Sequence, residues 1–168
     1  MIDTSYNINK FNSVIHTTAR DEDLIINEWI VHNILLGFEH IYIYDDNSII
    51  PISETIKILP NWIQEKLTIY RLSFDKFEEE AIKNTEYIEY YKSEIIDNKQ
   101  LFIIKYFIYK HKHLSNWCLF CDIDEFIYLR DHENINIFLK KYENETNLLI
   151  HGYHMVHHLS LIIFIVII

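Results

Sequence analysis

The sequence predicts an α/β fold: a mostly parallel sheet flanked by helices, in a single domain. Short apolar, β-branched segments alternate along the chain with longer segments of helical character, a pattern typical of parallel sheets. A length of 168 residues allows one domain with a real core and is too short for two. With 49% hydrophobic and 24% charged residues, the composition indicates a globular chain.

Five segments have the length and composition of strands. The first covers residues 11–20, and the second, residues 41–44, is closed by the turn-forming residues 45–48. The other three cover residues 67–72, 117–124 and 147–156. The apolar residues 159–168 are too few to span a bilayer, and we interpret them either as a buried strand or as the scar of a truncation or frameshift.

Helices are expected between these strands. Residues 21–23 are acidic, which suits a helix N-terminus, and Gly37 stands where the first helix should end. The other expected helices are a short one before Pro60, two pieces of residues 76–113 that meet near residues 97–100, and one over residues 134–144.

Charge and composition exclude several classes of function. A net charge of −10 argues against nucleic-acid binding, which needs basic residues to neutralise phosphates. The N-terminus shows no apolar core of a secretory signal, and no segment has the clear length of a membrane span. The compartment is left open, with the cytoplasm as the default expectation.

Cys118 and Cys121 form a C-x2-C pair, which could be half of a zinc site or a redox pair. The sequence has no second cysteine pair, and residues three apart on a strand face opposite ways. We therefore interpret both as structural cysteines.

Charged side chains stand at the carboxyl ends of three of the predicted strands. The carboxyl ends of parallel strands share one edge of the sheet, and ligands of α/β proteins bind beyond that edge. We therefore predict a ligand site there. The residues at these strand ends are Arg20 and Asp21, Asp45 and Asp46, and Asp122 and Asp124.

Asp122 and Asp124 are the candidate metal ligands. Residues two apart on an extended segment point the same way, so both carboxylates could face one Mg²⁺ or Mn²⁺ ion. Such an ion could neutralise a diphosphate as it leaves. The alternative is an acidic turn exposed to solvent, because an isolated D-x-D is common.

Other polar residues have both a binding and a structural interpretation. Asp45 and Asp46 could hydrogen-bond a ribose or a base, although they also suit an ordinary turn. Arg20 could pair with a phosphate, while Asp21 could cap the following helix. The histidines near the C-terminus fit no compact zinc pattern, but His154 could complete a metal site from the strand after D-x-D.

Two stretches, ARDEDLIINEWIVHNILLGFEHIYIYDDNS and WCLFCDIDEFIYL, carry a set of short motifs at residues 19–22, 28–29, 32, 37, 45–48, 117 and 122–126. As a set, these motifs resemble glycosyltransferase family 92 and the related family 2-like enzymes. That group has the GT-A fold, a Rossmann-like sheet with a D-x-D motif. The resemblance extends over roughly residues 15–129.

The resemblance implies metal-dependent transfer of a sugar from a UDP- or GDP-sugar to an acceptor hydroxyl, with inversion and with Mn²⁺ or Mg²⁺ on the diphosphate. The acceptor (glycan, protein or lipid) and the catalytic base stay unassigned. The implied donor-binding residues are Arg20, Glu22, Asp45, Asp46 and Asp122, and the candidate metal ligands are Asp122, Asp124 and His154.

Members of this group continue well past D-x-D, into an acceptor-binding part. Here the predicted domain covers residues 11–156, followed by an apolar tail over residues 157–168, so we expect a chain truncated at its C-terminus. The alternative function is a non-catalytic nucleotide-binding or interaction remnant of such an enzyme. A haloacid-dehalogenase-type phosphatase also has a strand ending in D-x-D, but a Thr or Val is expected where Phe126 stands.

Overall fold

Among the residues that the computed structural model describes (10–71, 73–84, 86, 99–130, 134–145, 147–153 and 160–167), six strands form one sheet. Their order across the sheet is β3-β2-β1-β4-β6-β5. The strands are β1 (Phe11–Ala19), β2 (His40–Asp45), β3 (Leu67–Arg71), β4 (Ser115–Phe120), β5 (Asn147–Tyr153) and β6 (Ser160–Ile167).

Four of these strands are parallel, which confirms the predicted fold class. β1 pairs in parallel with β2 and with β4, and β2 pairs in parallel with β3. β6 is antiparallel to both β4 and β5. The apolar segment near the C-terminus is therefore a strand inside the sheet, between β4 and β5.

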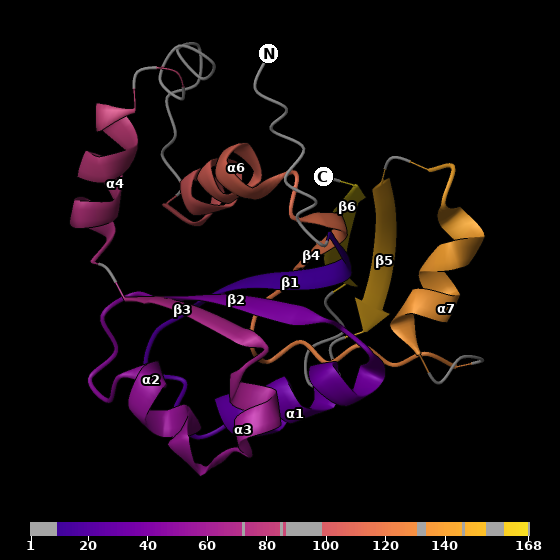
Figure 1. Ribbon diagram of the computed structural model, residues 1–168, viewed down its shortest axis with the longest axis horizontal. Coiled ribbons are helices and arrows are strands. Elements are labelled where there is room, and N and C mark those ends of the chain that lie inside the picture. Colours follow the sequence, from indigo (N-terminus) through magenta and orange to yellow (C-terminus); the bar gives the residue numbers. More distant parts are fainter. Residues whose placement is uncertain are drawn as a thin grey trace, which may run out of the picture.

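Helices cover both faces of the sheet. Figure 1 shows α1, α2 and α3 on one face and α4 and α6 over the other, with α7 beside β5. The helices are α1 (Ile26–Leu36), α2 (Ile52–Thr55), α3 (Asn61–Gln64), α4 (Phe74–Lys83), α6 (Lys99–His111) and α7 (Ile135–Leu139), with 3-10 turns η1 (Ile56–Ile58) and η2 (Lys140–Tyr142).

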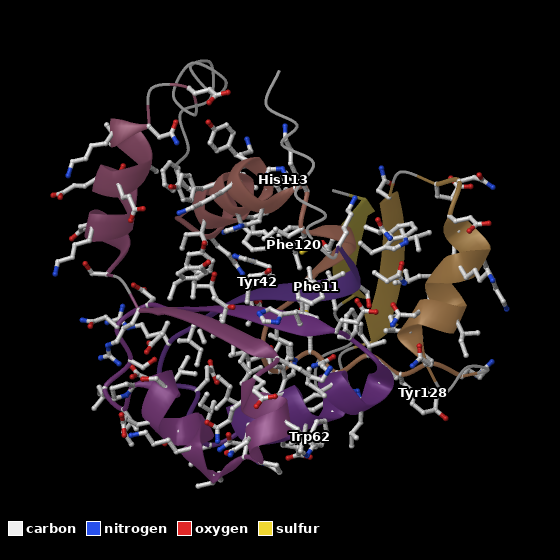
Figure 2. The ribbon with its side chains drawn as sticks, viewed as in Figure 1. Phe11, Tyr42, Trp62, His113, Phe120 and Tyr128 are labelled. Atoms are coloured by element: carbon white, nitrogen blue, oxygen red, sulfur yellow. The ribbon has the colours of Figure 1, made fainter. Side chains whose placement is uncertain are left out.

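The strands bury side chains on both faces because neighbouring residues of a strand point to opposite sides. On β1, Ile15 packs into the core under α1, while Val14 packs into the core under α6. On β4, Leu119 and Phe120 divide in the same way. Figure 2 shows Tyr42 and Phe120 between the sheet and α6, with Trp62 on the opposite side.

The first helix ends at the predicted glycine but begins later than expected. Gly37 has φ +107° and donates its backbone N–H to the carbonyl of Ile34, a left-handed C-cap. The N-cap is Ile25, and no side chain caps this end. The suggestion that Asp21 caps the helix is wrong, because its carboxylate instead accepts the backbone N–H of Ile49.

Two further predictions change in detail. The helix expected before Pro60 is a short α-turn followed by a 3-10 turn, and α3 begins directly after this proline. Of residues 76–113, the part between residues 87 and 98 lies outside the described residues. Within the described ranges, no helix combines the length and the apolar character needed to cross a bilayer.

Candidate functional site

The loops after β1 and β2 are tied together at the carboxyl edge of the sheet. Asp46 donates its backbone N–H to the carbonyl of Ala19 (2.9 Å). Asp21 donates its backbone N–H to Ser48 Oγ (3.0 Å) and accepts from Ile49 N–H (2.7 Å). Asp21 adopts φ +58°, a left-handed conformation that Asp tolerates better than most residues. These bonds fix where the neighbouring side chains point.

Asp45 lies under this loop. Its side chain is 0% exposed and forms an ion pair with Arg71 from the end of β3 (3.0 Å). The carboxylate also accepts the backbone N–H groups of Ser48 (2.8 Å) and Ile52 (3.2 Å). Arg71 donates a second hydrogen bond, to the carbonyl of Ser48 (2.8 Å). The buried carboxylate of Asp45 therefore stabilises the loop after β2 through hydrogen bonds to its backbone.

Asp46 and Arg20 point the other way, into a cavity above the sheet edge. Their side chains lie 3.7 Å apart, a surface ion pair in which Arg20 is 67% exposed. An exposed pair of this kind is weak, so the guanidinium of Arg20 can exchange its partner for an anionic ligand. Both residues line the cavity.

The D-x-D residues lie on a turn. β4 ends at Phe120, and Asp122 follows outside the strand. The backbone N–H of Glu125 donates to the carbonyl of Asp122 (3.2 Å), and the N–H of Asp122 donates to Glu125 Oε2 (2.9 Å). The expected extended geometry of this segment is therefore wrong, although Asp122 and Asp124 still line the same cavity.

Helix α1 holds this turn in place. The indole N–H of Trp29 donates to the carbonyl of Glu125 (2.9 Å), and a ring nitrogen of His32 hydrogen-bonds the carbonyl of Ile127 (2.8 Å). From the other face of the sheet, the amide of Gln100 on α6 donates to Asp122 Oδ1 (2.7 Å). The first carboxylate of the motif thus has one oriented oxygen.

The cavity that these loops surround has a volume of about 630 Å³, within the range of small-molecule sites in proteins. It lies beyond the carboxyl ends of β1, β2 and β4, where the topology predicts a ligand. Among the described residues of its lining, Arg20 supplies a guanidinium beside several carboxylates. The charged residues that line it are Arg20, Glu22, Asp46, Asp122 and Asp124.

The donor set fits a hard divalent cation that shares its ligands with a substrate. Asp122 and Asp124 supply two carboxylates to one cavity. Within the described part of the chain, no group of three or more His, Cys, Asp and Glu side chains could hold a metal alone. Mg²⁺ usually binds through one or two carboxylates together with waters and substrate phosphates, so two carboxylates beside a cavity suit that mode.

A sequence profile of glycosyltransferase family 92 matches residues 16–161, most of the chain. The chain belongs to glycosyltransferase family 92. No curated protein matches it. The match confirms the resemblance found in the sequence and identifies the protein as a glycosyltransferase, an enzyme class that uses a nucleotide-sugar donor and an acceptor.

Of the seven donor-binding and metal-ligand candidates from the sequence of this family 92 protein, five line the cavity, one lies beneath the loop after β2, and one lies outside the described residues. The cavity brings together Arg20, Glu22, Asp46, Asp122 and Asp124. Asp45 lies beneath the loop and is outside the cavity lining, so its contact with a donor stays a prediction. His154 lies outside the described residues.

Sequence reasoning missed residues of the cavity that carry no motif. Thr18 comes from the end of β1, and Gln100 and Ile103 come from α6. An uncharged residue on a distant helix gives no spacing signal. For Thr18, its place two residues before Arg20 at a strand end could have indicated the site.

Both cysteines are free thiols. Cys118 is buried in the core under α6, and Cys121 is half-buried. Burial raises the pKa of both thiols well above the usual value, and for Cys121 the nearby carboxylates of Glu125 and Asp122 add to the effect. Both side chains are therefore uncharged near neutral pH, as structural cysteines are.

Proposed function

We propose that this glycosyltransferase binds a nucleotide-diphosphate sugar, a UDP- or GDP-sugar, in the cavity of about 630 Å³ and transfers the sugar to an acceptor hydroxyl with inversion. The observation that carries the proposal is the convergence of the D-x-D carboxylates and Arg20 on one cavity in a family 92 chain.

Each side chain of the cavity has a distinct part in this proposal. Asp122 and Asp124 would hold Mn²⁺ or Mg²⁺, which, when bound, neutralises the charge of the departing diphosphate. Arg20 would leave Asp46 and pair with the diphosphate, because guanidinium groups bind phosphate oxygens in a bidentate manner. Asp46, released from Arg20, would accept hydrogen bonds from ribose hydroxyls.

The loops contribute by keeping these groups in place before the ligand arrives. The turn of Asp122 is held by Trp29 from one side and by Gln100 from the other. The loop of Asp46 is held by the buried carboxylate of Asp45. Groups that are already oriented lose little entropy on binding, so a ligand keeps more of its contact energy.

The test is a thermal-shift panel on the purified chain with UDP, GDP, CDP and their sugars, each with and without Mn²⁺. Binding to the folded state raises the melting temperature by mass action. We expect a Mn²⁺-dependent rise for one nucleotide, lost in the Asp122→Asn, Asp124→Asn double variant. No rise with any nucleotide would contradict the proposal and favour a remnant without donor binding.

Substitution of both aspartates must leave the fold intact for this test to be informative. Asparagine keeps the size of each side chain and removes its charge. The double variant should therefore melt close to the wild-type chain in the absence of ligand. Glu143→Gln, at the C-cap of η2 and outside the cavity lining, is a matched control that should keep the Mn²⁺-dependent rise.

A further inference from the structure

Three carboxylates, those of Asp122, Asp124 and Glu125, stand within four residues at the D-x-D turn. Asp122 and Asp124 line the cavity of about 630 Å³, whereas Glu125 lines a smaller cavity of about 180 Å³ and is absent from the lining of the larger one. Glu125 is half-buried. Its carboxylate is therefore not among the groups that line the proposed donor site, and it needs a different explanation.

The contacts between Glu125 and Asp122 are reciprocal. Oε2 of Glu125 accepts the backbone N–H of Asp122 (2.9 Å), and the backbone N–H of Glu125 donates to the carbonyl of Asp122 (3.2 Å). A Glu that accepts the backbone N–H of the residue three positions before it forms half of the capping box found at helix starts. Here the same arrangement closes a turn, so one residue fixes both backbone polar groups of Asp122.

Glu125 is itself anchored to the core. Its backbone carbonyl accepts the indole N–H of Trp29 (2.9 Å), and Trp29 on α1 is fully buried. Between the two aspartates, Ile123 is also buried and belongs to the same core cluster as Trp29. Glu125 thus connects a rigid part of the molecule to the backbone of Asp122.

The direction of the two aspartates depends on this connection. On an extended strand, alternation alone would point both carboxylates the same way, but these residues follow β4 in a turn. In a turn, side-chain directions follow from the backbone dihedral angles, which the hydrogen bonds that close the turn hold in place. Without the Glu125 acceptor, Asp122 and Asp124 would lose their common direction toward the cavity.

We propose that Glu125 is a positioning residue for metal and donor binding, which holds both D-x-D carboxylates toward the larger cavity through its hydrogen bond to the backbone of Asp122. The inference rests on the proposed function, which assigns a metal ion to Asp122 and Asp124. It gives Glu125 no contact with the metal or the nucleotide. Groups that orient metal ligands in this way typically change metal affinity by about ten- to a hundredfold.

Two variants of Glu125 separate its hydrogen bond from its charge. Glu125→Gln keeps an acceptor oxygen on a side chain of the same length, and Glu125→Met keeps the length but has only a weak thioether acceptor. Both lack the carboxylate charge, so a difference between them reports the hydrogen bond. Glu125→Ala, which also lacks the acceptor, should match Glu125→Met. Glu143→Met, at the C-cap of η2 and outside both cavity linings, is the matched control.

Calorimetric titrations of UDP and GDP in buffer with Mn²⁺ compare the wild type with these variants. We expect Glu125→Met to bind the nucleotide about tenfold more weakly than Glu125→Gln does, and Glu143→Met to bind it as the wild type does. Equal affinities of the Gln and Met variants would overturn the inference. A residue that only stabilises the fold would give that result together with a lower melting temperature of Glu125→Met.

A measurement without ligand separates the failure of this inference from the failure of the proposed function. The heteronuclear NOE of the backbone amides of Asp122 and Asp124, measured by NMR, reports the order of the turn on the ps–ns timescale. We expect high values in the wild type and in Glu125→Gln, and lower values in Glu125→Met. If this pattern holds while no nucleotide binds the wild type, the proposed function fails and the positioning of the turn by Glu125 stands. Equal values in all three proteins would overturn the inference, whether or not a nucleotide binds.

Discussion

Asp45 should be needed for stability, in contrast to its neighbour Asp46. Its buried carboxylate accepts from the backbone N–H groups of Ser48 and Ile52 and pairs with Arg71. In Asp45→Ala both N–H groups lose their acceptor, at a cost of about 1–3 kcal/mol each. The Arg71 side chain is 36% exposed and can turn to water, so it adds little. We expect the free energy of unfolding to fall by about 2–6 kcal/mol.

Asp46→Ala is the matched control. The carboxylate of Asp46 makes a surface ion pair with Arg20 at 3.7 Å, and such pairs contribute less than about 1 kcal/mol to stability. The unfolding free energy of this variant should therefore stay within about 1 kcal/mol of the wild type, while its affinity for the nucleotide should fall because Asp46 lines the cavity.

The assay is urea denaturation followed by tryptophan fluorescence and circular dichroism, with midpoint and slope fitted together. Nucleotide affinity is measured separately, in buffer without urea. A wild-type midpoint for Asp45→Ala, combined with weakened nucleotide binding, would refute the reasoning, because it would give the carboxylate a role in contact with the ligand instead of in the loop.

Three other predictions follow from single contacts. Gln100→Leu removes the amide that orients the first D-x-D carboxylate and should weaken Mn²⁺ binding about tenfold, measured by calorimetry, with Gln64→Leu on α3 as the control. The folded-state pKa of His16 is lowered to about 3 by burial, so only the unfolded chain takes up this proton as the pH falls below about 6.5. Between about pH 7 and about pH 5, His16 should lower the unfolding free energy by about 2 kcal/mol, in addition to the drops from His40 and His111, whose pKa values burial also lowers to about 4. In urea denaturation at both pH values, the drop for His16→Phe should be smaller than the wild-type drop by that amount. Gly37→Ala should cost about 1–2 kcal/mol in urea denaturation, because Gly37 has φ +107° and an added Cβ would lie 2.3 Å from Asn134 Nδ2.

The fold and the location of the site could be predicted from local patterns. Strand-helix alternation predicts a parallel sheet, and a parallel sheet places the carboxyl ends of its strands on one edge. Arg20, Asp46 and Asp122 were assigned to that edge because each follows a strand, and all three line one cavity. This reasoning uses only sequence order, so it needs no knowledge of packing.

The separation of roles within the site could not be predicted in this way. Asp45 and Asp46 are adjacent and chemically identical, and only the position of Arg71 at the end of β3 shows which carboxylate is buried. Likewise, Gln100 reaches Asp122 from a helix that is distant in sequence. Such contacts depend on how β3 and α6 pack against the sheet, and no periodicity or spacing encodes that packing.

The family motif itself contains residues that support the site without lining it. Trp29 and His32 lie on α1, and their hydrogen bonds to the carbonyls of Glu125 and Ile127 connect this helix to the D-x-D turn. Gly37 ends the same helix, and its carbonyl accepts from Asn136 at the start of α7. A helix joined at several points to the loops around one cavity fixes their relative positions. The spacing of these motif residues is therefore a requirement of geometry, which explains why the set identifies the family although no single residue does.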